Sequence, residues 1–138
     1  MNDNTALIQK IYAAFGRGEI QTILDRLTPD VQWVLDGPAA IPYSGARTGV
    51  DQVAGFFEAL ATTQENHTLT IDEYIAQGDN VVTVGRYAAD VKSTGKRIDC
   101  AVAHVFTIRD GKIARFLDFV DTAQMADAYV GAAAAAGR

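Results

Sequence analysis

The second half of the chain alternates long strand-like segments with short turns, and this pattern restricts the fold more than any other feature. The strand-like segments are Thr68–Ile75, Val81–Val91, Lys96–Ile108 and Lys112–Val120. The turns between them, 77–80, 93–95 and 109–111, each contain a glycine. Turns this short join antiparallel neighbours, so the segments predict an antiparallel meander. Long strands twist and curl, so we expect the sheet to be curved.

The first half of the chain carries helical patterns. The first predicted helix has one apolar stripe formed by Leu7, Ile8, Ile11, Tyr12 and Phe15. Asn4 or Thr5 is its predicted cap and Gly16–Gly18 ends it. A second short helix is predicted over Glu19–Leu27. The third predicted helix opens at Thr48 and Asp51, which are spaced like a capping box, and turns Val53, Phe56, Phe57 and Leu60 inward.

The remaining segments complete the prediction. Val31–Leu35 reads as a short strand, Asp36–Gly49 as a loop, and residues from Thr122 to Val130 as a final short helix. The alanine-rich tail, residues 131–138, is expected to fray. Helices followed by a meander predict an α+β domain over residues 1–138. Its sheet must bury one face under the helices, and a curled sheet closed by helices leaves a pocket at one end.

Composition excludes several classes of function. The formal net charge is −5 and no basic stripe is present, which argues against binding to nucleic acid or to an anionic membrane. The single cysteine, Cys100, rules out an intrachain disulfide and fits a reducing compartment. The N-terminus lacks the basic and apolar regions of a signal peptide, and no run of apolar residues is long enough to span a membrane. We therefore expect a cytoplasmic protein.

The last two predicted strands carry the candidate catalytic residues. In Lys96–Ile108 the even positions are the bulkier ones, so they should face the helices, and His104 lies among them. In Lys112–Val120 the carboxylate of Asp118 interrupts an apolar row that includes Phe116 and Val120.

The turn between these strands decides whether His104 and Asp118 meet. A two-residue turn at Asp110 and Gly111 would pair His104 with Leu117 and turn Asp118 to the other face. A three-residue loop, 109–111, would pair His104 with Phe116 and make His104 and Asp118 diagonal neighbours on one face. We favour the three-residue loop, because it places the larger side chains on one face.

An inward Asp118 among aromatic residues would be suited to acid–base work, because burial disfavours the charged form of a carboxylate. The alternative is that Asp118 is fully hydrogen-bonded and holds the strand end, and that His104 is a core residue. Asp121 directly precedes the last predicted helix, so we interpret it as a cap or an ion-pair partner. The inward or outward direction of Arg86 is left open by the sequence.

Further residues are predicted to line a pocket that binds a small apolar molecule. They are Tyr12, Phe15, Trp33, Tyr43, Phe56, Val102, Phe106 and Phe116. Tyr43 lies in the predicted loop and is expected at the rim or in a lid. No nucleotide-binding glycine motif, nucleophile elbow or cluster of metal ligands is found, so we expect neither a cofactor nor a metal.

Several short motifs, in their order along the chain, resemble one family. They are Ile11–Glu19, Asp30–Trp33, the stretch from Tyr43 through Gly49, and His104–Phe106 followed by Arg109–Ile113. They resemble the SnoaL-like and ketosteroid-isomerase-like branch of the nuclear transport factor 2 (NTF2-like) superfamily, which has a cystatin-like fold. The resemblance implies a cone of three N-terminal helices on a curved mixed sheet, usually as a homodimer.

The resemblance also bears on chemistry. His104 falls where steroid isomerases of this superfamily have a neutral aspartic acid, but their general base aligns with Leu35 and their helical tyrosine with Ile11. The polyketide cyclases carry a histidine and an acid–base aspartate at the spacing of His104 and Asp118. The leading hypothesis is therefore an isomerase or cyclase for a carbonyl-containing, polyketide- or steroid-like molecule. The alternatives are a non-catalytic binding module and a dimeric interaction domain.

Overall fold

The strands form a single curved, six-stranded sheet in the order β2-β1-β6-β5-β4-β3. The computed structural model describes residues 3–136. The strands are β1 (Leu27–Leu35), β2 (Gly45–Thr48), β3 (Gln64–Gln77), β4 (Asn80–Val91), β5 (Arg97–Arg109) and β6 (Lys112–Val120). The helices are α1 (Asp3–Gly16), α2 (Ile20–Leu24), α3 (Val50–Thr63) and α4 (Thr122–Ala136). The predicted α+β architecture is confirmed.

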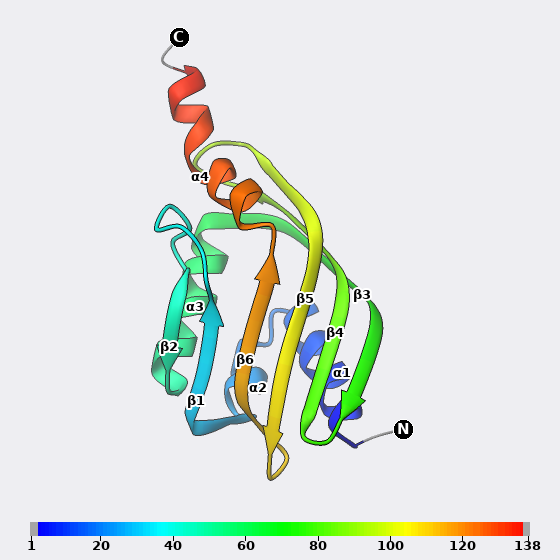
Figure 1. Cartoon of the computed structure of the whole chain (residues 1–138). Helices are drawn as coiled ribbons and strands as arrows, with labels where there is room; N and C mark the ends of the chain where they lie inside the picture. The colour runs from blue at the N-terminus through cyan, green and yellow to red at the C-terminus, as the bar shows by residue number, and fades with distance from the viewer. Residues whose placement is uncertain (1–2, 137–138) are drawn as a thin grey trace.

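All neighbouring strands pair antiparallel except β1 and β6, which pair parallel. The first three helices lie behind the curved sheet and α4 stands at its upper end (Figure 1). The core lies between these helices and the concave face of the sheet, where the even-numbered residues of β5 from Ile98 to Ile108 are buried. The predicted orientation of β5 is therefore confirmed.

The predicted boundaries in the first half of the chain need correction. The second helix spans only Ile20–Leu24, because the backbone carbonyl of Arg26 already accepts a hydrogen bond from Ile113 of β6, so that β1 begins at Leu27. Helix α1 begins at Asp3, so the predicted caps lie inside its first turn.

Three further boundaries differ from the prediction. The predicted loop contains β2, a strand of small and polar residues that pairs with the end of β1 and lacks an apolar alternation. The predicted capping box is wrong: the residue that precedes α3 is Gly49, at φ 87°, and the backbone N–H of Thr48 donates to Gln52 Oε1. Helix α4 continues past Val130 to Ala136, in keeping with the high helix propensity of alanine. Residues 137 and 138 of the predicted frayed tail lie outside the described residues.

The hairpin between β5 and β6 combines features of both predicted registers and matches neither. Asp110 and Gly111 form a two-residue turn with φ of 52° and 75°, as in a type I′ turn, and Arg109 pairs with Lys112. The register then shifts by one residue between Thr107 and Ile108, so that Ala114 is unpaired. This bulge returns Phe116 and Asp118 to the concave face and places Asp118 directly opposite His104.

Candidate functional site

An apolar cavity lies between the helices and the concave face of the sheet. Water-sized molecules can be centred in about 70 Å³ of it. Its walls come from the helices, from the sheet and from the loop between β1 and β2. The lining residues are Ile11, Tyr12, Phe15, Ile23, Trp33, Tyr43, Phe56, Phe57, Leu60, Leu69, Tyr87, Val102, His104, Phe106, Phe116, Asp118, Val120 and Met125. His104 and Asp118 are the only titratable residues in this wall other than tyrosines.

His104 and Asp118 face each other across the β5–β6 ladder inside this cavity. Their side chains are 8% and 11% exposed, and His104 Nε2 lies 3.2 Å from Asp118 Oδ1. Although the two atoms are within ion-pair distance, Asp118 Oδ1 receives no aligned hydrogen bond from any described residue. The imidazole N–H and the carboxylate therefore lie side by side and are not directed at each other.

The other ring nitrogen of His104 is held by Tyr12 of α1. Tyr12 Oη lies 2.6 Å from His104 Nδ1 and 2.5 Å from the hydroxyl oxygen of Thr83 on β4. Burial raises the pKa of Tyr12 far above its usual value, so its hydroxyl keeps its proton.

The hydrogen-bond directions follow from this arrangement. We assign the proton to Nε2, which lies 3.2 Å from the Asp118 carboxylate oxygen, so that Nδ1 accepts a hydrogen bond from Tyr12. Thr83 then donates to Tyr12. The resulting chain, Thr83 to Tyr12 to His104, orients the imidazole with its Nε2–H toward the cavity.

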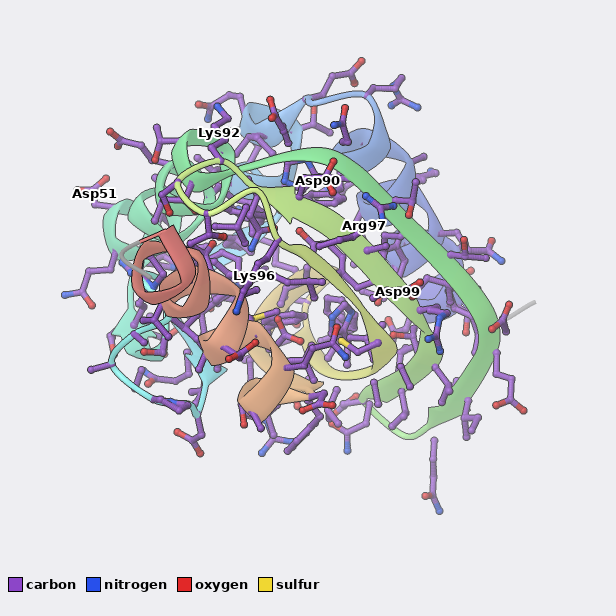
Figure 2. The ribbon with its side chains drawn as sticks, turned by 90° about the horizontal axis from the view of Figure 1, so that it is seen from above. Asp51, Asp90, Lys92, Lys96, Arg97 and Asp99 are labelled. Carbon is purple, nitrogen blue, oxygen red and sulfur yellow. The ribbon has the colours of Figure 1, made fainter. Side chains whose placement is uncertain are left out.

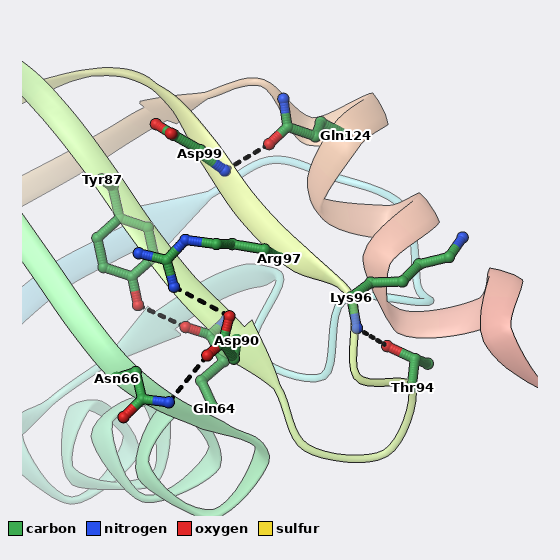
Figure 3. A network of polar contacts seen from close by, with 9 residues as sticks. All are labelled: Gln64, Asn66, Tyr87, Asp90, Thr94, Lys96, Arg97, Asp99 and Gln124. Carbon is green, nitrogen blue, oxygen red and sulfur yellow. Dashed lines mark hydrogen bonds and ion pairs between the residues drawn. The ribbon is translucent and has the colours of Figure 1, made fainter.

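A second buried polar cluster, centred on Gln64, closes the end of the cavity near α4. The side-chain amide of Gln64 donates to the hydroxyls of Tyr43 and Tyr129 at 2.7 and 2.8 Å. It accepts a hydrogen bond from Tyr87 (Figure 3). The Tyr43 hydroxyl donates in turn to Met125 Sδ at 3.2 Å. These bonds tie α4 to the sheet and satisfy the tyrosine hydroxyls internally.

The structure corrects the predicted position of Tyr43. This side chain is only 1% exposed, and burial raises its pKa. It is a wall residue in the core and not a rim or lid, because the Gln64 amide draws its hydroxyl inward.

All the residues predicted to line the pocket do line this cavity, together with His104 and Asp118. Sequence reasoning missed Thr83 and Gln64, which are 0% and 1% exposed. Thr83 lies in a predicted strand, and Gln64 lies between the third predicted helix and the first strand-like segment; neither position gave a sign of burial. The position of Thr83 beside the site becomes evident only from its pairing with His104 between β4 and β5.

Other polar residues named by the sequence lie outside the cavity. Asp121 Oδ1 accepts a hydrogen bond from the backbone N–H of Gln124 at 3.0 Å, so the predicted cap of α4 is confirmed. Arg86 points outward and pairs with Asp99 at 2.7 Å. Seen from above, the charged residues Asp90, Arg97 and Asp99 lie along the neighbouring strands β4 and β5 (Figure 2).

Residues 3–136 contain no group of three or more histidine, cysteine, aspartate or glutamate side chains placed to hold a metal ion. No helix within this range is long and apolar enough to cross a membrane.

Comparison with known proteins finds relatives over nearly the whole chain. An uncharacterised protein of Mycobacterium tuberculosis is 27% identical over 114 residues, which is 82% of this chain and 85% of that protein. An NTF2-like protein of unknown function from Burkholderia pseudomallei is 28% identical with a TM-score of 0.87, covering 94% of this chain and 99% of that chain.

Two more solved structures are similar to the same extent. An NTF2-like protein from Burkholderia thailandensis is 30% identical with a TM-score of 0.82, covering 93% of this chain and 98% of that chain. TerC, co-crystallised with polyporic acid, is 29% identical with a TM-score of 0.81 and covers the same shares, 93% and 98%. A model of the SnoaL-like domain matches residues 8–116. The chain therefore belongs to the SnoaL-like domain family, within the NTF2-like superfamily of cystatin-like folds.

Proposed function

We propose that the chain binds a small, mostly apolar carbonyl compound in this cavity and catalyses proton transfer at the carbon next to the carbonyl. The observation that carries the proposal is the pair of His104 Nε2 and Asp118 Oδ1, 3.2 Å apart, with no aligned hydrogen bond between them. A general base and a hydrogen-bond donor placed side by side in an apolar cavity match the needs of an enolising reaction.

In the proposed reaction Asp118 moves the proton and His104 stabilises the charge on the oxygen. The Asp118 carboxylate takes a proton from the carbon beside the carbonyl, and the electrons of that C–H bond form the C=C bond of an enolate. The negative charge that develops on the oxygen accepts a hydrogen bond from His104 Nε2–H. Asp118 then returns the proton to another carbon, which isomerises the substrate. Alternatively, the enolate carbon attacks a second carbonyl, which closes a ring, and Asp118 gives its proton to the alkoxide that forms from that carbonyl.

The size of the cavity limits the ligand. About 70 Å³ of it is open to the centres of water-sized molecules, which favours a small ligand. A compound of one or two rings is therefore the first ligand to test, ahead of a polyketide or steroid. The co-crystallisation of TerC with polyporic acid supports binding of an organic ligand by this fold and makes that compound a useful second probe.

The test is exchange of carbon-bound hydrogen for deuterium. We expect the wild-type protein in D₂O to exchange the hydrogens next to the carbonyl of 2-indanone, measured by proton NMR. Asp118→Asn should slow this exchange by about 100-fold or more, because the amide is not a base, while the Kd for 2-indanone changes little. Asp72→Asn, which removes one exposed carboxylate from β3, is the matched control and should exchange like wild type.

A binding module without turnover is the second candidate, and the mostly apolar wall of the cavity favours it. Wild-type protein that binds 2-indanone or polyporic acid, yet exchanges hydrogen no faster than Asp118→Asn, would remove the catalytic step and support this candidate. Saturable binding to neither compound would contradict both candidates.

A further inference from the structure

Trp33 carries a buried hydrogen-bond donor that no described residue satisfies. The residue is 3% exposed, and its indole Nε1 has no hydrogen-bond partner within residues 3–136. A buried indole N–H normally finds an acceptor, because leaving it unpaired loses the hydrogen bond it made with water in the unfolded chain. An unpaired donor in a cavity wall therefore points to a missing partner.

The surroundings of Trp33 hold the indole in place. Its ring stacks on Phe116 with ring centroids 4.0 Å apart. The rings of Phe56 and Phe57, from α3, meet it edge-on at 5.7 and 5.5 Å. None of these neighbours can accept a strong hydrogen bond, and their packing prevents the ring from turning toward a distant acceptor. The ring lines the cavity, so a ligand bound there lies against the indole.

The tyrosine hydroxyls of the cavity wall already have partners. Tyr12 is bonded to His104 and Thr83, and the hydroxyls of Tyr43 and Tyr87 are bonded to Gln64. Among the polar side-chain atoms of the described wall, those left without an aligned hydrogen bond are therefore Trp33 Nε1, His104 Nε2 and Asp118 Oδ1.

The charge of the wall restricts the ligand further. Its described residues include no lysine or arginine, and Asp118 contributes a negative charge. Such a cavity disfavours a carboxylate or phosphate, because burying an anion beside an anion without a counter-ion is costly.

We propose that Trp33 Nε1–H donates a hydrogen bond to an uncharged oxygen of the ligand. The ligand is thus a neutral, planar compound with a carbonyl or similar acceptor, such as an aryl ketone, and is neither a hydrocarbon nor a carboxylate. This inference rests on the ligand-binding part of the proposed function and is independent of proton transfer.

The single tryptophan of the chain makes the inference directly measurable. Uniformly ¹⁵N-labelled protein shows one indole N–H signal, which belongs to Trp33. We expect saturation with acetophenone to move this signal downfield, as for an N–H that gains an acceptor. Ethylbenzene has the same ring and nearly the same shape without the oxygen, so it corrects for ring-current effects and should not cause that shift.

Affinities supply a second readout. Acetophenone should bind about threefold to tenfold more tightly than ethylbenzene, which is the range for one net hydrogen bond. Benzoate should bind more weakly than either. In Trp33→Phe the preference for acetophenone over ethylbenzene should disappear. The control Phe116→Leu changes the same wall without touching the donor and should weaken both ligands alike.

The outcomes separate this inference from the proposed reaction. Equal indole shifts with acetophenone and ethylbenzene in the unmodified protein, or tighter binding of benzoate than of acetophenone, would overturn the role of Trp33 whatever Trp33→Phe does to folding. A downfield shift confined to acetophenone, in a protein that shows no deuterium exchange, would support the role of Trp33 and remove only the catalytic step.

Discussion

The orientation of His104 is set by a helix residue distant in sequence. Tyr12 belongs to the apolar stripe that packs α1 on the sheet, and its ring reaches the concave face with the hydroxyl 2.6 Å from His104 Nδ1. Its helical spacing predicts Tyr12 as an apolar lining residue, but its hydroxyl also forms a hydrogen bond with His104. The acid–base proposal depends on this contact, because only an Nε2–H imidazole can donate to the ligand while Asp118 remains a carboxylate.

Replacing Tyr12 by phenylalanine tests this contact. We expect Tyr12→Phe to lower the free energy of unfolding by about 1–2 kcal/mol, because Nδ1 and Thr83 lose a buried partner. The ¹⁵N shifts of the His104 ring should report the Nε2–H tautomer in wild-type protein and a mixture of tautomers in the variant.

Tyr74→Phe is the matched control, because Tyr74 packs edge-on against Tyr12 and the exchange likewise removes only a hydroxyl. Its His104 signals should match those of wild type. A His104 tautomer that is the same with and without the Tyr12 hydroxyl would contradict the proposed orientation.

At the scale of elements, the bulge in β6 decides which side chains reach the cavity. Ile113 and Phe116 are both buried although they differ in parity, because Ala114 is left out of the pairing. Without the bulge, the two-residue turn at Asp110 and Gly111 would place Asp118 on the outer face. The alternation of side chains in β6 predicts that Asp118 faces inward, and the turn residues allow a two-residue turn. Both are correct together only because of the bulge.

The bend of the sheet depends on a second irregularity, where β3 passes closely over Gly85 of β4. The register of β3 shifts between Ile71 and Glu73, and a Cβ built on Gly85 would lie 1.9 Å from the carbonyl oxygen of Thr70. A side chain at this position forces two strand backbones apart. Strands β3 and β4 can therefore approach each other this closely only because residue 85 is glycine.

Gly85→Ala is expected to lower the free energy of unfolding by about 3 kcal/mol, since overpacking against backbone cannot be relieved by a rotamer change. Urea denaturation measures this loss. Gly16→Ala at the end of α1 is the control, because a Cβ there meets nothing within 4 Å, and it should be neutral or slightly stabilising. A Gly85→Ala variant as stable as wild type would show that β3 can move away without cost.

At the scale of the whole molecule, the outer face of the sheet is unusually apolar. Cross-strand pairing aligns Ile75, Val82, Val105, Leu117 and Val34 in one row, and Phe119 beside it is 56% exposed. The first three helices all lie on the opposite face (Figure 1). A solvated sheet face normally carries polar residues. A continuous apolar row on a sheet face is typical of a protein–protein contact surface.

We propose that a second copy of the chain covers this face. Charges of both signs border it, with Arg86 paired to Asp99 on one side and Arg115 on another, so a two-fold arrangement of identical faces can place opposite charges together. Light scattering should then give about twice the 14.8 kDa mass of one chain.

Phe119→Lys should shift the protein to monomers. Val130→Lys is the control, because Val130 on α4 is 52% exposed but lies outside this row. A monomeric wild-type protein, or equal dissociation by both variants, would argue against the proposed interface.

The sequence by itself determined the class of fold, the inward face of β5, ten of the residues that line the cavity and the family. These are local or periodic properties: alternation in a strand, an apolar stripe on a helix, glycine in a turn. Only the tertiary structure decided the register that opposes His104 and Asp118, the contact of Tyr12 with His104, the burial of Thr83 and Gln64, and the unpaired N–H of Trp33. Each of these depends on atoms far apart in the chain, and a bulge of one residue changes which face a side chain occupies.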